Sequence, residues 1–243
     1  MGSAFFWGAF GAAALLVGAV VALLTPIPPR VLGLVMALGG GVLISAVSFD
    51  LVEEAVDTSD DLGGVALGLA CGALAFYLGD DVIDRMGGDK RKSSGGEQAD
   101  GSGPAIVLGA VLDGIPESIV LGLGLLGGTG VSLAFIAAVF LSNLPEGIAG
   151  TTGLRAAGWE PRRVIGLWLL VIAVSATASL AGYALFDAAS DTTVAFVLAF
   201  AGGAVLTMLS DTMMPEAFEH GGRAVGLVTT AGFALAFALH LIE

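Results

Sequence analysis

The sequence predicts an all-α polytopic membrane protein with eight transmembrane helices, on the basis of its composition and its long apolar runs. Of its 243 residues, 56% are hydrophobic and only 13% are charged, which is typical of membrane proteins rather than soluble ones. The 38 glycines favour close packing between membrane helices. The single cysteine, Cys71, excludes an internal disulfide and a cysteine-based metal cluster.

Eight apolar runs are expected to cross the bilayer, because each approaches or exceeds the roughly 20 residues that a crossing requires. In chain order they are Ala4–Leu24, Val31–Val52, Gly64–Leu78, Pro104–Leu126, Val131–Gly150, Val164–Phe186, Val194–Met214 and Ala224–Ile242. Each gap between them carries a turn signal or charged residues. We therefore expect residues 1–243 to form a single transmembrane domain surrounded by the lipid bilayer.

Two connections between these runs have distinctive compositions. Asp84–Gly103 is rich in Gly, Ser, Asp and Lys, and it predicts a flexible cytoplasmic linker between the third and fourth spans. Gly127–Gly130 predicts a tight turn, which makes the fourth and fifth spans an antiparallel hairpin.

The nine Lys and Arg residues all fall in connections on one side of the expected topology. Arg30 follows the first span and Arg223 precedes the eighth, and the others lie between spans three and four or five and six. The positive-inside rule assigns this side to the cytoplasm, so we expect a multi-pass cell-membrane protein with both termini outside. Trp7, Trp159 and Trp168 fall near span ends, where the aromatic belt places tryptophan.

Two short stretches inside the fourth and fifth spans are similar to each other. Asp113-Gly-Ile-Pro-Glu-Ser118 and Ser142-Asn-Leu-Pro-Glu-Gly147 each place a proline and a glutamate within an apolar run. Each proline removes one backbone hydrogen bond, so Pro116 and Pro145 are expected to kink their helices and free a carbonyl. Proline together with an ionisable group at membrane depth normally indicates a function.

The spacing within each motif brings oxygen atoms together. Asp113 and Glu117 are four residues apart, as are Ser142 and Glu146, so each pair shares a helix face. Asn143 adds an amide oxygen. At roughly 1.5 Å per residue, both pairs lie about 18–22 Å along the helix from the intervening turn, near the bilayer midplane. Three carboxylates at one depth repel one another unless a cation neutralises them, so these residues predict a divalent-cation site.

Further acidic residues suit a path to and from that site. Asp50 and Glu54 lie at the outer end of the second span, and Asp211 and Glu216 lie near the inner end of the seventh. Headgroups and water solvate carboxylates at helix ends equally well, so both interpretations stay open. Likewise, the two motifs have a purely structural alternative, in which proline and glutamate only kink the helices. His240, in the last turn of the chain, is expected to be interfacial rather than a ligand.

A second internal similarity links the second and seventh spans at a constant spacing of 162 residues. The equivalent groups are Gly40-Gly-Val-Leu, Ser48 and Glu54-Ala55 in the first copy and Gly202-Gly-Ala-Val, Ser210 and Glu216-Ala217 in the second. Because the second span runs outward and the seventh inward, these copies are expected to be inverted, as in many transporters. Glu216, Glu219 and His220 also have the helical spacing that suits a cytoplasmic release site.

On these motifs and this topology, the chain resembles the ZIP family of divalent-metal transporters. That family has eight spans, both termini outside, and paired His-Asn-x-Pro-Glu-Gly motifs on its fourth and fifth spans. Ser142–Gly147 keeps five of the six letters, counting x, and has Ser142 in place of histidine. Asp113–Ser118 keeps the proline and glutamate, with Asp113 and Gly114 in place of histidine and asparagine. Pro215–Ala217 also resembles the end of the family's seventh span.

The resemblance implies a ZIP-like 3+2+3 arrangement with inverted repeats, and inward transport of a divalent metal ion as substrate. It implies that Glu117, Asn143 and Glu146 are metal ligands, and that Asp113 and Ser142 occupy the histidine positions. An all-oxygen set favours harder cations such as Mn²⁺, Fe²⁺ or Mg²⁺, although carboxylates also bind Zn²⁺. The expected substrates are therefore zinc, iron or manganese. Glycine-rich helix faces and the resemblance together indicate a homodimer.

Two other function classes remain open at this point. A relative that binds metal without transporting it, as a sensor or scaffold, would fit the missing motif histidines. An intramembrane hydrolase built on Glu53-Glu54 or Ser142 needs a histidine at membrane depth, whereas His220 and His240 are predicted at span ends. We therefore expect a transporter rather than an enzyme, and no interaction with nucleic acid.

Overall fold

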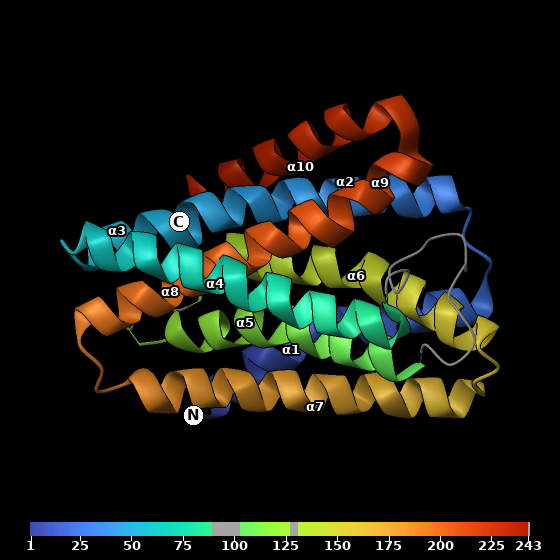
Figure 1. Cartoon of the computed structure of the whole chain (residues 1–243), viewed down its shortest axis with the longest axis horizontal. Helices are drawn as coiled ribbons and strands as arrows, with labels where there is room; N and C mark the ends of the chain where they lie inside the picture. Colours follow the sequence, from blue (N-terminus) through green and yellow to red (C-terminus); the bar gives the residue numbers. More distant parts are fainter. Residues whose placement is uncertain (89–102, 127–130, 243) are drawn as a thin grey trace.

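The computed structural model describes residues 1–88, 103–126 and 131–242, in which all regular elements are helices aligned broadly along one long axis (Figure 1). The α-helices are α1 (Gly2–Leu24), α2 (Pro29–Ala46), α3 (Glu54–Thr58), α4 (Leu62–Ile83), α5 (Gly103–Leu123), α6 (Leu133–Ala156), α7 (Pro161–Phe186), α8 (Asp191–Met208), α9 (Met214–Gly221) and α10 (Val225–His240). Three π-helical segments, η1 (Val47–Glu53), η2 (Asp84–Gly88) and η3 (Leu209–Met213), and the 3₁₀ turn η4 (Gly222–Ala224) complete them.

Seven helical segments of the described chain are long and apolar enough to cross a membrane, which agrees with the predicted class of protein. The last of them, Asp191–His240, has 50 residues and contains both α8 and α10. Gly222 lies between these two helices and has a φ of 66°, in the left-handed region that glycine tolerates best. The chain turns back near this residue, so α10 runs alongside α2 (Figure 1).

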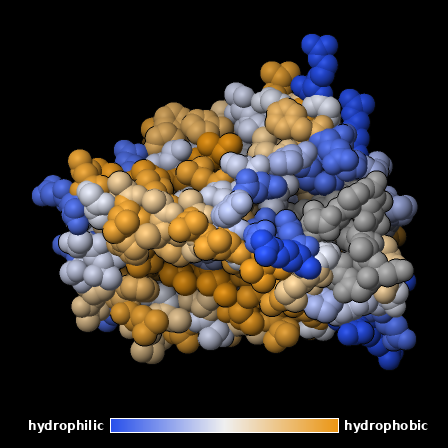
Figure 2. Space-filling view, in the orientation of Figure 1, coloured by the Kyte–Doolittle hydropathy of each residue, from blue (hydrophilic) through white to orange (hydrophobic). Residues whose placement is uncertain are grey.

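The surface of the molecule fits a lipid environment. Hydrophobic residues fill the centre of the face shown in Figure 2, and hydrophilic residues gather mainly toward its ends. Of the candidate spans, α4 and its extension are the least buried, with 22% of the apolar window inside the molecule. Its outward side chains are large and apolar, including Leu67, Leu74 and Leu78. Lipid tails satisfy such a face, whereas a soluble monomer rarely exposes one of this size.

The third helix is longer than the sequence predicted. It begins at Leu62, where the Asp61 carboxylate accepts a hydrogen bond from the Gly64 N–H at 3.0 Å, and it continues as η2 to Gly88. An ion pair of 2.8 Å between Arg85 and Asp81, one turn apart, joins α4 to η2. The expected linker therefore starts after Gly88 rather than at Asp84. The rest of that linker up to residue 102, and the glycine turn at 127–130, lie outside the described residues.

The helices form a central group with two flanking pairs. In the central group α1 and α7 pack together, α6 packs on α1, and α5 packs on α7. One flanking pair, α2 with α10, contacts α6, and the other pair, α8 with α4, contacts α5. Both chain termini lie at the same end of the long axis (Figure 1), which we call the termini end. The basic residues of the described chain lie in or next to turns at the opposite end.

The internal similarity at a spacing of 162 residues extends to whole elements. α2 and α8 differ by 162 at both their first and last residues, and η1 and η3 begin 162 residues apart. Even a local hydrogen bond is repeated, since Ser48 Oγ donates to the Ile44 carbonyl and Ser210 Oγ donates to the Leu206 carbonyl. α2 and α8 run in opposite directions along the long axis (Figure 1). The sequence similarity therefore corresponds to two structural copies of opposite direction.

Trp168 does not lie at an interface, so that prediction is wrong. Only 1% of its surface is exposed, and its indole N–H donates to Thr151 Oγ1 at 2.8 Å. Gly150 leaves room for the indole, because a Cβ there would lie 2.9 Å from the ring. α7 begins at Pro161, earlier than predicted, so Trp168 lies two turns inside the helix and faces α6.

Candidate functional site

The two proline-glutamate motifs lie in the middle of α5 and α6. Pro116 lies inside α5 and Pro145 inside α6, and neither helix ends at its proline. The kink that we expect at each proline stays a prediction. Each glutamate follows its proline directly, so both carboxyl groups lie well away from either helix terminus.

All five predicted metal ligands are buried. The exposed fraction is 3% for Asp113 and Glu117, 1% for Ser142, 4% for Asn143 and 7% for Glu146. Charged side chains are almost never this buried in proteins unless a partner or a metal compensates the loss of water. Three carboxyl groups within two neighbouring helices therefore make this the most highly charged part of the protein interior that the structure describes.

Asn143 is held in a defined orientation by α1. Its Nδ2 donates to the Gly11 carbonyl at 3.3 Å. Because a carbonyl oxygen can only accept, this contact fixes which arm of the amide faces α1. The amide Oδ1 is the atom that a cation would bind.

The surroundings of Ser142 show that α6 packs tightly against α2. Ser142 Oγ donates to the Val139 carbonyl at 3.0 Å and keeps its lone pairs for other contacts. A Cβ at Gly39 of α2 would lie 3.1 Å from the Leu141 carbonyl and 3.2 Å from the Ser142 Cα. The carbonyl that Pro145 leaves without its helical donor therefore lies beside the backbone of α2.

Gly114, the second residue of the α5 motif, lies beside α7. A Cβ at Gly114 would lie 3.3 Å from Ser175 Oγ on α7, and Ser175 is itself only 3% exposed. The Ser175 hydroxyl would have to shift by a few tenths of an ångström to admit a Cβ here. Gly114 thus lies where α5 approaches α7, while Asn143, at the equivalent position of the α6 motif, donates to α1.

Asp50 and Glu54 line a cavity of about 680 Å³ at the termini end. Asp187, Asp191 and His240 also line it, so five ionisable side chains surround this opening. Its deeper wall is apolar and includes Val120, which follows Glu117 by one helical turn on α5. The cavity thus reaches a residue about one helical turn from Glu117, although none of the five predicted ligands lines it.

His240 is part of this cavity rather than a residue of the interface alone. Its Nδ1 lies 3.7 Å from Asp50 Oδ1, and its ring stacks on Phe49 with a centroid separation of 5.2 Å. Asp50 Oδ1 also accepts a hydrogen bond of 2.7 Å from Ser132 Oγ. The side chain of Asp50 is only 8% exposed. Through these contacts Asp50 links η1 to the start of α6 and to the end of α10.

We expect Ser132→Ala to lower stability by about 2 kcal/mol, more than removal of an ordinary helix cap. Ser132 Oγ accepts from the Phe135 N–H at 3.0 Å as the N-cap of α6, and it also donates to Asp50. Ser190 caps α8 by accepting from the Thr193 N–H at 3.3 Å, and it shares a second hydrogen bond of 2.9 Å with Thr193 Oγ1. Both bonds are exposed and local, so Ser190→Ala is the control for a cap without a bond to another helix. Thermal unfolding in detergent measures both. Equal losses in the two variants would show that the bond to Asp50 contributes no more than an exposed local bond.

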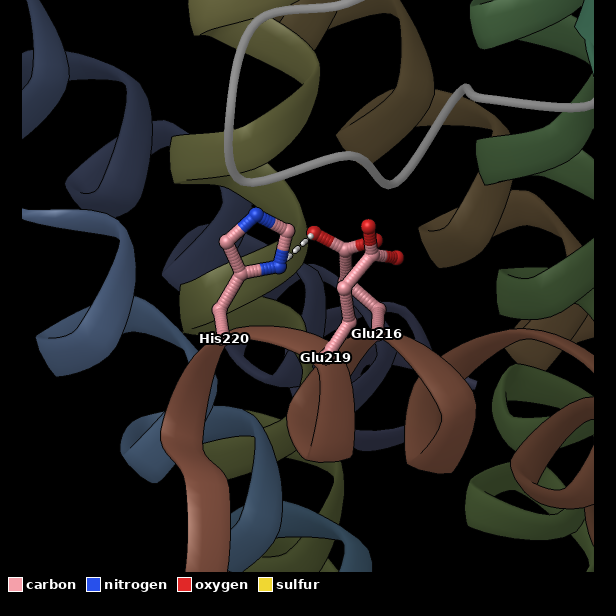
Figure 3. Close-up of side chains that lie close together, drawn as sticks. All are labelled: Glu216, Glu219 and His220. Atoms are coloured by element: carbon pink, nitrogen blue, oxygen red, sulfur yellow. Dashed lines mark ion pairs between the residues drawn. The ribbon is translucent and has the colours of Figure 1, made fainter.

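At the opposite end, Glu216 lies in a cluster with Glu219 and His220 on α9. The ligand atoms of these three side chains all lie within 4.8 Å of one another. His220 Nδ1 and Glu216 Oε1 are 3.0 Å apart, and Figure 3 shows all three side chains on the same side of α9. Asp211, the other predicted exit residue, is exposed in η3 and is not a member of this cluster.

Sequence reasoning missed one buried carboxyl group, Asp80 of α4, which is 7% exposed. A Cβ at the preceding Gly79 would lie 3.1 Å from the Leu112 side chain, so Gly79 and Leu112 are in contact. Asp80 and Asp113 are the residues that follow these two. The third span was expected to end at Leu78. The i, i+4 spacing of Asp80 and Asp84 was the available signal that a helical face continues beyond that residue.

Comparison with models of known protein families found no match for this chain, and comparison with curated proteins also found none. The resemblance to the ZIP family therefore depends on the predicted topology and on the two short motifs.

Proposed function

We propose that this protein transports divalent transition-metal cations across the membrane through a site formed by α5 and α6. The observation that carries the proposal is the burial of Asp113, Glu117 and Glu146, each at most 7% exposed, inside two long apolar helices. Such groups are costly in a membrane protein and are retained where an ion or proton passes. Ser142 and Asn143, about one turn before Glu146 on α6, supply further oxygen atoms.

The proposed topology has eight crossings. It counts α8 and α10 as separate spans, since the chain turns back near Gly222 between them. The arrangement is then α1, α2 and α4, followed by the pair α5 and α6, followed by α7, α8 and α10. An even number of crossings leaves both termini on one side, and the basic residues at the opposite end assign the termini side to the exterior.

In the proposed mechanism, the acidic cavity at the termini end collects cations at Asp50 and Glu54. The ion loses water as it binds the carboxylates of Asp113, Glu117 and Glu146, helped by Asn143 and Ser142. It leaves past Asp211 and Glu216 when the repeat-related helices shift around the central pair α5 and α6. Oxygen ligands favour manganese and iron, and carboxylates also accept zinc.

The test is metal uptake into proteoliposomes by the wild type and by Glu146→Gln, with Zn²⁺, Mn²⁺, Fe²⁺, Cd²⁺ and Mg²⁺ offered separately. Glutamine keeps the size of the side chain but removes the charge, so we expect uptake to fall roughly 10- to 100-fold. Glu160→Gln is the control, because Glu160 is exposed at the start of α7. Absence of wild-type flux for every ion, in vesicles that hold folded protein, would overturn the proposal and favour a sensor or scaffold.

A further inference from the structure

The cluster on α9 has the geometry of a metal site that is separate from the buried motif. Glu216, Glu219 and His220 follow the i, i+3, i+4 spacing, which places three side chains on one helix face. Their ligand atoms lie within 4.8 Å of one another, with His220 Nδ1 and Glu216 Oε1 at 3.0 Å (Figure 3). Atoms bound at about 2.0–2.2 Å to a tetrahedral metal lie about 3.4 Å apart. Side-chain rotation alone can therefore close this cluster around an ion.

The backbone that carries these residues is held firmly by α2. Ala217, the residue after Glu216 on α9, is fully buried. A Cβ at Gly33 would lie 2.8 Å from the Gly221 nitrogen, 3.1 Å from the Ala217 carbonyl and 3.2 Å from His220 Cβ. This close approach fixes α9, and with it the starting point of the histidine side chain. A site on a fixed helix loses less entropy when it binds an ion than one on a loop.

The internal repeat shows how the ligand atoms of this cluster differ from those at the equivalent positions of the first copy. The residues 162 positions earlier are Glu54, Asp57 and Thr58 on α3, where Glu54 and Thr58 line the cavity at the termini end. That copy offers oxygen atoms only. His220 replaces Thr58 and supplies an imidazole nitrogen. Imidazole nitrogen favours Zn²⁺ and Co²⁺ over Mg²⁺ and Ca²⁺, whereas carboxylates alone discriminate less.

We propose that Glu216, Glu219 and His220 bind one divalent transition-metal ion at the end of the protein opposite the termini. Three protein ligands leave a fourth position open to water or to an incoming ligand. The ion is therefore held in an accessible site that can exchange with the surrounding solution. This binding needs only α9 and its support by α2, so it does not depend on transport through α5 and α6.

The test is calorimetric titration of the purified protein in detergent with Co²⁺. We expect His220→Gln and Glu219→Gln each to weaken one binding event roughly 10- to 100-fold. Glu219 is exposed, so its substitution leaves folding intact and keeps the test decisive if the histidine variant is unstable. His240→Gln is the matched control, since it removes the chain's other histidine at the other end and should leave this binding event unchanged.

Two results would overturn this assignment. One is Co²⁺ binding that is unchanged in both α9 variants, and the other is binding that is lost in His240→Gln instead. Glu146→Gln separates this site from the transport site, because it should lower uptake roughly 10- to 100-fold yet preserve the binding event on α9. Loss of uptake with the α9 event intact supports two independent sites. Absence of uptake in the wild type, together with binding that requires His220, refutes transport but not this metal site.

Discussion

Gly72→Leu is expected to abolish the folded protein. A Cβ at Gly72 of α4 would lie 1.8 Å from the Phe200 carbonyl oxygen of α8, and that atom belongs to helical backbone that cannot rotate away. In the same contact, a Cβ at Gly203 of α8 would lie 2.1 Å from the Leu69 carbonyl oxygen. Overpacking a core costs about 1–3 kcal/mol when side chains can adjust. Separating two helix backbones costs more, and the whole stability of a domain is about 5–15 kcal/mol.

The measurement is the yield of monodisperse protein by size-exclusion chromatography, followed by its thermal midpoint in detergent. Gly166→Leu in α7 is the control, since a Cβ at Gly166 meets no atom within 4 Å. Leucine is also the better helix former there, so the control should be at least as stable as the wild type. If the two variants gave the same yield and midpoint, the close contact of α4 with α8 would not exist in solution.

The same contact occurs a second time in the molecule, between α2 and α10. A Cβ at Gly41 would lie 1.9 Å from the Thr229 carbonyl, and one at Gly232 would lie 2.2 Å from the Leu38 carbonyl. Gly41 and Leu38 of α2 correspond to Gly203 and Phe200 of α8 at the spacing of 162 residues. Thr229 and Gly232 of α10 correspond to Leu69 and Gly72 of α4 at a spacing of 160 residues. α4 from the first copy therefore packs on α8 from the second, and α10 from the second packs on α2 from the first. Each copy is completed by a helix of the other.

The apolar helices were predictable because their length and hydropathy are properties of local sequence. Their packing was not, because it depends on glycines that meet a distant backbone. No local sequence pattern distinguishes Gly72 of α4, which lies against α8, from Gly166 of α7, where a Cβ would meet no atom within 4 Å. The third helix was predicted too short for a related reason. Hydropathy falls at Asp80, whereas the Arg85–Asp81 ion pair and the buried Asp80 belong to a continuing helix.

The candidate site, like the fold, could be predicted from the sequence only in part. Asp113, Glu117 and Glu146 could be identified from the sequence, because ionisable residues near a proline inside an apolar run form a local pattern. The contacts that surround them were not visible, such as the bond from Asn143 to the Gly11 carbonyl. The position of His240 beside Asp50 joins residues 190 positions apart in the chain, and no local pattern indicates it. Proximity of this kind arises only when the helices assemble.

Asp113→His is expected to shift the metal preference of uptake toward Zn²⁺ relative to Mn²⁺ by roughly tenfold, or about 1.4 kcal/mol. Asp113 stands where the resemblance places a histidine, and the substitution replaces an oxygen ligand with a borderline nitrogen. Asp113 is the better position for this change than Ser142. Ser142 is 1% exposed, and its backbone lies where α6 packs tightly on α2 at Gly39, which leaves little room for α6 to adjust around a larger side chain.

The measurement is initial uptake of Zn²⁺ and Mn²⁺ into proteoliposomes, expressed as a ratio for each variant. Asp113→Asn is the matched control, because it removes the charge without adding nitrogen as a strong ligand, and it should reduce uptake of both ions together. A ratio that stays constant in Asp113→His while uptake continues would show that Asp113 does not contact the metal. A shifted ratio, with both ions reduced in Asp113→Asn, is the result expected from direct contact between residue 113 and the metal, since the ratio cancels any loss of folded protein.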